Sequence, residues 1–150
     1  MRAAATDLPR HLGFVRQFME REIPFNRELG IRVVELGAGL AILEIPFRDA
    51  LIGDVQRPAL HGGVLSALMD TAGGAAVWTC IGEEDRCSTI DLRVDYLRPA
   101  GLETVRARAE VLRVGNRVGV TNIRLYHPGA DADVVAEGKG VYSVKRASDR

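Results

Sequence analysis

One carboxylate stands alone in a long uncharged segment, and its isolation is the first sign of chemistry in this sequence. Between residues 58 and 82, with histidine counted as neutral, Asp70 is the only formally charged residue. Burying an unpaired carboxylate costs several kcal/mol. Asp70 is therefore either paired or held by hydrogen bonds, or its cost is tolerated because the carboxylate has a functional role. A poorly solvated carboxylate can orient and deprotonate a water molecule. Asp70 is therefore the candidate general base or nucleophile.

The same segment begins with His61-Gly62-Gly63, where a helix is expected to start. The first N–H groups of a helix have no partner inside the helix and carry the positive end of its dipole, so they favour a developing oxyanion. Gly62 lets this backbone come close to a bound group. Its N–H is therefore the candidate oxyanion donor.

A long helix is predicted from about His61 to Cys80, with small or apolar residues on nearly every side. Such a helix cannot lie on a surface, so the sheet must curl around it. Spacings of three and four bring a set of mostly small residues onto one face: Gly63, Ser66, Ala67, Asp70, Gly73, Gly74 and Val77. A glycine inside a helix costs about 1 kcal/mol relative to alanine. We expect another backbone, a ligand, or both to pack closely against this face.

Hydrophobic periodicity predicts the elements before the long helix. Apolar residues at helical spacing between Asp7 and Pro24 predict an amphipathic helix that the proline ends, within an N-terminal segment of residues 1–28. Two β-rich runs separated by residues 37–39 predict a hairpin. Residues 48–60 are expected to form a loop.

After the long helix the pattern predicts strands to the end of the chain. Ile90, Leu92, Val94 and Tyr96 alternate with charged residues and are expected to form the buried face of one strand. Further strands are expected over about 105–111, 118–126 and 134–144. Together these elements predict an α+β fold in one domain, residues 1–150, with an antiparallel sheet of five to six strands wrapped around the central helix.

These features resemble a known family. The helix opens "HGG" with an acid nine residues after the histidine, follows a hairpin, and precedes "TIDLRVDYLRPA". From about Leu29 to Val144 the chain resembles the hotdog-fold acyl-CoA thioesterases of the phenylacetate-degradation (PaaI-type) group. The resemblance implies hydrolysis of an acyl-CoA thioester to free acid and coenzyme A. It also implies that Asp70, or a water next to it, attacks a carbonyl polarised by a backbone N–H at the helix start.

Helix geometry adds an expectation about assembly. Gly62 and Asp70 are eight residues apart, which is roughly 12 Å along a helix axis, so one thioester cannot easily reach both. Two antiparallel copies of the helix across a two-fold axis would bring Gly62 of one chain beside Asp70 of the other. We therefore expect a homodimer with composite sites. The family resemblance implies the same arrangement, commonly with dimers paired into tetramers.

The resemblance also suggests roles for further residues. Thr89 matches a position close to the family's catalytic acid and would help to hold the water, although a threonine that merely starts a strand explains it equally well. His61 matches the motif histidine and is expected to fix the helix start. Where the family often has an asparagine, this chain has Val55, and Gln56 or Asp54 would have to replace it.

The remaining substrate-binding candidates are small residues of the helix face and basic residues. Gly63, Ser66 and Gly74 lie on the face of Asp70. Arg113 and Arg117, together with Arg98 and Lys139, could hold the phosphates of coenzyme A, although such residues are more often a solvated face. A serine triad is not expected, because the chain has no G-x-S-x-G elbow around Ser66.

Composition restricts the partners. Twenty basic and twenty acidic residues leave no net charge, which gives no support for nucleic-acid binding. We expect a cytoplasmic protein without a membrane span. Cys80 and Cys87 are expected to be reduced thiols, buried or incidental. Three scattered histidines, with His11 on the polar side of the first helix, give no metal site, and coenzyme A is expected as part of the substrate rather than as a cofactor.

Two other functions stay open. A hotdog dehydratase or hydratase would use a histidine opposite the acid, and the chain lacks the "HFPG"-like loop that would carry it. A non-catalytic acyl-CoA binding or regulatory module would have no use for a desolvated Asp70.

Overall fold

The computed structural model describes residues 7–149. Its N-terminal part consists of α1 (Leu8–Gln17), the π-helical turn η1 (Phe18–Glu22) and α2 (Pro24–Leu29). The expected amphipathic helix is present, but Pro24 also begins α2, because a proline fits the first helical position, where no N–H partner is needed. Residues 1–6, which belong to the expected N-terminal segment, lie outside the described residues.

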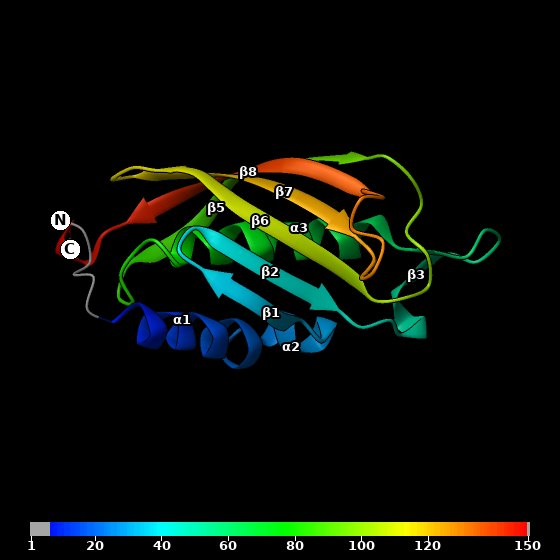
Figure 1. The fold of residues 1–150 in the computed structure, drawn as a ribbon, viewed down its shortest axis with the longest axis horizontal. Coiled ribbons are helices and arrows are strands. Elements are labelled where there is room, and N and C mark those ends of the chain that lie inside the picture. The colour runs from blue at the N-terminus through cyan, green and yellow to red at the C-terminus, as the bar shows by residue number, and fades with distance from the viewer. Residues whose placement is uncertain (1–6, 150) are drawn as a thin grey trace.

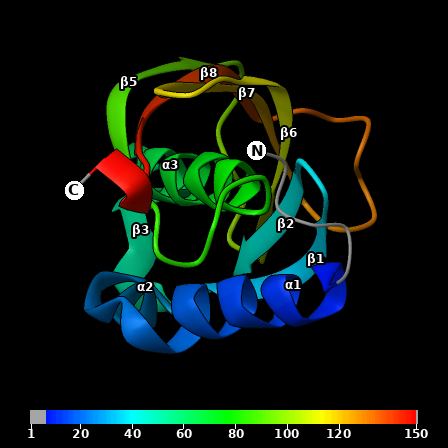
Figure 2. The same cartoon turned by 90° about the vertical axis from the view of Figure 1, so that its left-hand side faces the viewer.

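The first helix packs against the end of the central helix. The Phe18 ring lies edge-on against Trp78, with ring centroids 4.5 Å apart, and Val15 and Met19 are buried. His11, expected on the polar side, is half-buried, and its Nε2 lies 2.9 Å from the Trp78 carbonyl oxygen. The N-terminal helices therefore cover one side of the central helix (Figure 2).

Two strands follow in an antiparallel hairpin, β1 (Arg32–Gly37) and β2 (Leu40–Ile45). Its turn is the predicted one, and Gly39 has φ +75°, a conformation that favours glycine. The segment expected to be a loop is more ordered than predicted. It holds the 3-10 turn η2 (Asp49–Leu51) and a small hairpin of β3 (Ile52–Asp54) and β4 (Ala59–Leu60).

The central helix α3 (Gly62–Trp78) is flanked by sheet as predicted. Four strands come after it: β5 (Arg86–Tyr96), β6 (Val105–Val114), β7 (Val118–Tyr126) and β8 (Ala136–Lys145), with the 3-10 turn η3 (Ala147–Asp149) at the end. They join the first hairpin in one antiparallel sheet of six strands, ordered β1-β2-β6-β7-β8-β5. The sheet wraps around α3 in both views (Figures 1 and 2). The α+β hotdog architecture with a long central helix is confirmed.

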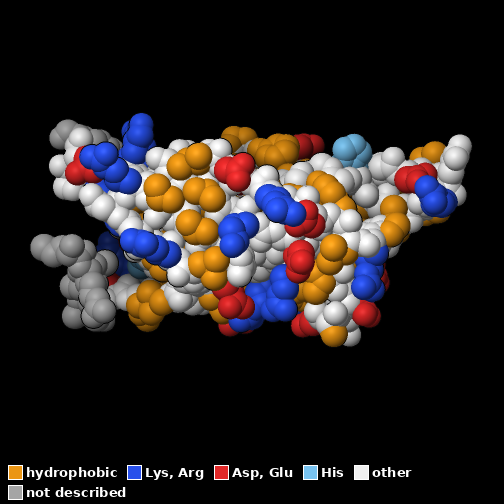
Figure 3. Space-filling view, turned by 90° about the horizontal axis from the view of Figure 1, so that it is seen from above, with side chains coloured by type: hydrophobic (Ala, Val, Ile, Leu, Met, Phe, Trp, Pro, Cys, Tyr) orange, Lys and Arg blue, Asp and Glu red, His pale blue; other side chains and the backbone are white. Residues whose placement is uncertain are grey.

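The core lies between α3 and the inner face of the sheet. Nine residues of α3 are buried, and strand residues such as Leu43, Ala107 and Leu125 face them with no exposed surface. The outer face of the sheet carries many charged side chains (Figure 3). Within residues 7–149 no helix is long and apolar enough to cross a membrane.

One strand differs from its prediction. Leu92 and Val94 are half-buried, but Ile90 and Tyr96 are 59% and 53% exposed. The pairing of β5 with β8 shifts between Thr89 and Asp91, which leaves Ile90 in a bulge. β5 is also the last strand of the sheet, and no other strand of the described residues pairs with its outer side. The expected four-residue buried face is therefore wrong at both of its ends.

Candidate active site

Asp70 lies on the side of α3 that faces β5. Its carboxylate Oδ1 accepts a hydrogen bond of 2.8 Å from the Thr89 hydroxyl. The side chain is half-buried, and no ion pair to it is found within residues 7–149. Thr89 sits inside β5 rather than at its start, immediately before the bulge. Bulges beside functional sites commonly re-aim a side chain, and here the strand directs Thr89 at the acid.

A cavity of about 210 Å³ opens beside this carboxylate, and we call it the Asp70 cavity. Its walls come from the N-terminal helices, α3, β5 and β8. The lining residues are Met19, Ile23, Asn26, Asp70, Thr71, Gly74, Trp78, Cys87, Ser88, Thr89 and Tyr142. The carboxylate and hydroxyl groups thus share the cavity with apolar side chains from η1 and the end of α3. This arrangement suits a substrate with a polar reacting group attached to an apolar chain.

Tyr142 supports the helix directly beneath Asp70. Its phenol donates a 2.9 Å hydrogen bond to the Asp70 backbone carbonyl. Burial, followed by the nearby charge of Asp70, raises the pKa of Tyr142 well above its ordinary value, so the phenol stays protonated and donating. A Cβ at Gly73 would lie 2.1 Å from the Tyr142 hydroxyl oxygen. The glycine in mid-helix is therefore explained by an aromatic side chain, rather than by the backbone or ligand that the sequence suggested.

Cys87 also lines the Asp70 cavity, which the sequence did not indicate. Burial, together with the charge of Asp70, raises the pKa of this thiol to about 11. The thiol is therefore protonated at neutral pH and is a poor nucleophile. Cys80 is exposed rather than buried.

The start of α3 holds the second set of predicted residues. His61 caps the helix, because its Nδ1 accepts a 2.8 Å hydrogen bond from the Gly63 N–H. The Gly62 N–H has no hydrogen-bond partner in the described part of the chain. Of the two glycine donors, only that of Gly62 is available to a bound group. The Tyr96 hydroxyl donates to the Gly62 carbonyl at 3.1 Å.

Gly62 lines a different depression, of about 350 Å³, which we call the Gly62 hollow. Its lining residues are Leu60, Gly62, Leu65, Tyr96, Leu97, Arg98, Pro99 and Ala100. None of them also lines the Asp70 cavity. Within one chain the candidate base and the candidate oxyanion donor therefore open onto separate depressions.

The other predicted substrate-binding residues are scattered. Gly74 lines the Asp70 cavity. Ser66 is half-buried and its hydroxyl donates to the Gly63 carbonyl at 3.2 Å, while Gly63 is exposed. Gln56 is exposed in the turn between β3 and β4, where its N–H donates to the Asp54 carboxylate. Gln56 lines neither depression.

The basic residues expected to hold phosphates separate into two groups. Arg113 and Arg117 lie near the turn from β6 to β7. Gly119, just after this turn, packs against Val77 at the C-terminal end of α3. Within one protomer this places them at the opposite end of the helix from Gly62. Arg98, in contrast, lines the Gly62 hollow.

The described residues hold no group of three His, Cys, Asp or Glu side chains that could bind a metal ion. The groups at the two depressions that could take part in a reaction are the Asp70 carboxylate, the Thr89 hydroxyl and the unpaired Gly62 N–H.

The chain is similar in sequence to known proteins. Residues 58–131 match the sequence pattern of the thioesterase superfamily. The chain is similar to the medium/long-chain acyl-CoA thioesterase YigI of Escherichia coli K12, with 33% identity over 132 residues, or 77% of this chain and 83% of YigI.

Solved structures show the same fold. A thioesterase family protein from Silicibacter pomeroyi superimposes with a TM-score of 0.82 at 25% identity, over 91% of this chain and 99% of that one. The conserved protein PA5202 from Pseudomonas aeruginosa superimposes with a TM-score of 0.75 at 28% identity, over 83% and 98% of the two chains.

Proposed function

The chain belongs to the thioesterase superfamily, and we propose that it hydrolyses acyl-CoA thioesters to free acid and coenzyme A at a site built around Asp70. The observation that carries this proposal is the Asp70 carboxylate, free of ion pairs among the described residues, bonded to Thr89 and lining a partly apolar cavity. YigI, named as an acyl-CoA thioesterase, supports the choice of substrate. Within the superfamily, the spacing of His61-Gly62-Gly63 and Asp70 favours the PaaI-type group.

Asp70 can start the reaction in two ways. As a general base it removes a proton from a water molecule, whose oxygen attacks the thioester carbonyl carbon. The C–S bond then breaks, and the sulfur leaves as the thiol of coenzyme A with one proton. As a nucleophile, the Asp70 carboxylate attacks the carbonyl carbon, the C–S bond breaks, and coenzyme A leaves as a thiolate that takes a proton from solvent. Water then hydrolyses the anhydride, which releases the free acid and restores the Asp70 carboxylate. In both routes the Thr89 hydroxyl holds the carboxylate in place.

The Gly62 N–H is the proposed donor to the oxyanion that forms at the thioester carbonyl. It is the first N–H of a 17-residue helix and has no partner among the described residues. The atoms nearest to a Cβ at Gly62 would belong to the Tyr96 side chain, at ordinary contact distances of 3.5 Å or more. This contact does not require a glycine, which agrees with the close approach of a bound substrate. His61 has the positioning role of capping the helix.

The site is proposed to form between two chains. In one chain Gly62 and Asp70 are roughly 12 Å apart along the axis of α3, and they line two separate depressions. Two antiparallel copies of α3 would join the Gly62 hollow of one chain to the Asp70 cavity of the other. The edge strand β5 carries exposed apolar side chains, among them Ile90 at 59% and Tyr96 at 53%. A partner chain lying along this edge would cover them.

The cavity wall suggests the class of acyl group. Met19, Ile23 and Trp78 give the cavity its apolar side, so an aliphatic or aromatic acyl chain would lie there. The chain lacks the "HFPG"-like loop that would carry the histidine of hydratase chemistry, and the Nδ1 of His61 is engaged in capping α3. Hydrolysis is therefore the better-supported reaction.

The experiment is a panel of acyl-CoA thioesters of increasing chain length, assayed with a thiol reagent that reports free coenzyme A. The protein is expected to release coenzyme A, and the Asp70→Asn variant to lose about two to four orders of magnitude in turnover, with unchanged circular dichroism and mass in solution. Parental turnover by this variant would remove Asp70 from the mechanism. Protection against heat by acyl-CoA without release of coenzyme A would identify a binding module.

A further inference from the structure

Two aromatic rings in contact lie at the apolar end of the Asp70 cavity. Trp78 lines the cavity from the C-terminal end of α3, and the Phe18 ring lies edge-on against it, with centroids 4.5 Å apart. We call this pair the aromatic wall. Phe18 also lines a second depression, of about 500 Å³, which we call the outer groove. The other residues that line the outer groove are Arg10, Phe14, Gln17, Glu22 and Glu83.

The aromatic wall separates the two depressions. Trp78 lines the Asp70 cavity but not the outer groove, and Phe18 lines the groove but not the cavity. The turn η1 is divided in the same way, because Met19 lines the cavity whereas Glu22 lines the groove. An acyl chain that extended beyond the aromatic wall would therefore enter the outer groove.

The local sequence holds the turn η1 in place. Hydrogen bonds of a π-helix join residues five apart, and such turns often mark functional sites. Pro24 has no N–H, so it cannot donate to the carbonyl of Met19, five residues before it. The Asn26 Nδ2 donates to this carbonyl instead, at 2.9 Å, and Asn26 is only 2% exposed. The turn that carries Phe18 and Met19 is thus fixed by a buried side chain.

The cavity has room for a chain between the acid and the aromatic wall. Trp78 follows Asp70 by eight residues, which is roughly 12 Å along the helix axis. Gly74 lines the cavity between them and has no side chain to block it. The volume of about 210 Å³ is smaller than the roughly 300–1,000 Å³ of pockets that hold drug-sized ligands. A compact acyl group fits in this space, whereas a longer one must meet the wall.

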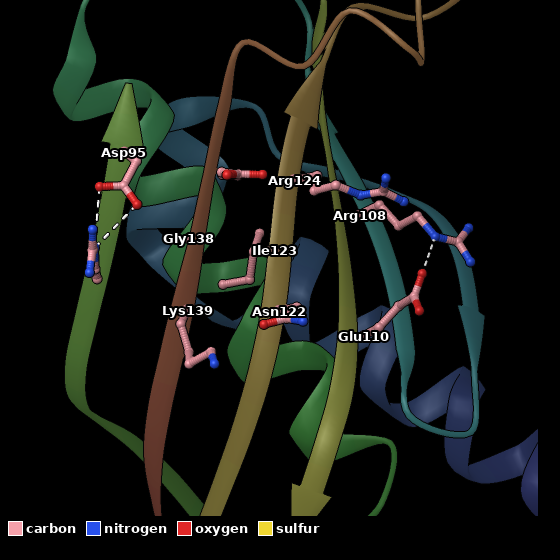
Figure 4. Close-up of a pocket in the computed structure, with 10 residues that line it drawn as sticks. Asp95, Arg108, Glu110, Asn122, Ile123, Arg124, Gly138 and Lys139 are labelled. Atoms are coloured by element: carbon pink, nitrogen blue, oxygen red, sulfur yellow. Dashed lines mark hydrogen bonds and ion pairs between the residues drawn. The ribbon is translucent and has the colours of Figure 1, made fainter. Parts of the chain in front are cut away.

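A depression of about 690 Å³ on the sheet offers no other path for an acyl chain. Most of its lining side chains are charged, among them Arg108, Glu110 and Lys139 (Figure 4). Along β6, Arg108 and Glu110 alternate with Ala107 and Ala109, which are fully buried in the core. This depression therefore lies on the face of the sheet away from α3, and so away from the Asp70 cavity.

We propose that Phe18 is a specificity-determining residue, which ends the acyl pocket at the aromatic wall and so sets the longest acyl chain that the protein accepts. This role rests on the proposed function, and it assigns the part of that site which selects the acyl group. To let a longer chain pass, Phe18 would have to leave its edge-on contact with Trp78 and its packing against Phe14, with centroids 5.9 Å apart.

The first experiment measures kcat/KM over a panel of acyl-CoA thioesters that grow by one methylene at a time. Beyond the longest accepted chain, kcat/KM of the parental protein should fall about 10- to 200-fold, the usual effect of one methylene that a pocket cannot hold. Phe18→Ala should move this fall to longer chains. Phe18→Leu loses less volume and should move it in the same direction by less.

Phe25→Ala is the matched control for the loss of a phenylalanine ring. Phe25 lies in the neighbouring helix α2, is 59% exposed and lines neither the Asp70 cavity nor the outer groove. This variant should keep the parental chain-length profile. Circular dichroism of each variant reports whether the fold is retained.

The second experiment needs binding but no reaction. Trp78 is the only tryptophan of the sequence, so its fluorescence reports on the aromatic wall. The probes are S-alkyl thioethers of coenzyme A with the same range of chain lengths, which cannot be hydrolysed. Emission should change once the alkyl chain is long enough to reach Trp78. Affinity should then weaken for longer chains, and Phe18→Ala should remove this weakening.

The two experiments separate the role of Phe18 from the hydrolysis. If no acyl-CoA is hydrolysed but the thioether profile shifts in Phe18→Ala, the proposed reaction is wrong and the acyl limit stands. Phe18 has no such role if folded Phe18→Ala and Phe18→Leu keep the parental profiles. The same conclusion follows if the parental protein accepts all chain lengths equally, or if no thioether changes the emission of Trp78.

Discussion

The two depressions along α3 have opposite chemistry, although one helix contributes to both. The Asp70 cavity holds an acid, hydroxyl groups and apolar walls from the N-terminal helices. The Gly62 hollow contains the unpaired N–H, the Tyr96 ring and the positive charge of Arg98, and no acidic side chain lines it. A thioesterase needs both an attacking group and an oxyanion donor at one carbonyl. This contrast is the reason for the proposal that each chain provides half of two sites.

After the loss expected for Asp70→Asn, the largest effect is expected from removing the donor from the Gly62 hollow. Gly62→Pro deletes the N–H at the first helical position, where proline is tolerated, and His61 already has the extended backbone that precedes a proline, with φ −63° and ψ 132°. Turnover of the best acyl-CoA should fall by about 10²- to 10³-fold. Gly62→Ala keeps the N–H and should lose less activity than the proline variant, because it only adds a Cβ near the bound substrate. If the proline variant turns over like the alanine variant, this N–H is not the oxyanion donor.

A smaller effect is expected from the hydroxyl in the Asp70 cavity. Thr89→Val keeps the shape of the side chain but removes the 2.8 Å hydrogen bond to Asp70. A hydrogen bond to a charged group is worth roughly 1.5–3 kcal/mol, so kcat should fall about 10- to 100-fold with little change in KM. Thr89→Ser should recover most of the rate. Equal rates for the valine and serine variants would assign Thr89 a packing role only.

A third effect is expected on stability rather than on turnover, from the packing of Tyr142 against α3 next to Asp70. Gly73→Ala forces a Cβ against the Tyr142 phenol, and such overpacking costs about 1–3 kcal/mol in the free energy of unfolding. Gly74→Ala is the matched control. It also replaces a glycine inside the helix by alanine, but its Cβ would lie at an ordinary contact distance of 3.5 Å from the Tyr142 ring. Chemical denaturation should separate the two variants. Equal stabilities would mean that Tyr142 moves aside at little cost.

The fold was largely predictable from periodicity and turn residues. The uncharged run of α3, the glycines of the first hairpin, and the strands expected over about 105–111, 118–126 and 134–144 each match an element of the structure. The β3–β4 hairpin was missed, because strands of three and two residues leave almost no periodic signal. The exposure of Ile90 was missed because a bulge is set by pairing between strands, which alternation within one strand does not report.

The candidate site was predictable where a residue stands out in type. Asp70 is the one charge in its segment, and the glycines at the helix start mark a close approach. Tyr142, Cys87 and Met19 were not found, because apolar and aromatic residues in a strand or a helix look like any other core residues. Arg113 and Arg117 were chosen for their charge and their place near the turn from β6 to β7, and in one chain they lie at the other end of α3 from Gly62. Their distance from the site depends on the partner chain.

Mixed dimers test the central claim, that one chain gives the acid and the other the N–H, most directly. The Asp70→Asn and Gly62→Pro chains are co-expressed with different affinity tags, and the heterodimer is purified through both tags. One of its two sites then has an intact Gly62 and an intact Asp70, while the other has both lesions. We predict about half of the parental turnover per dimer, from two parents that are each nearly inactive. A heterodimer as inactive as its parents would contradict the shared site.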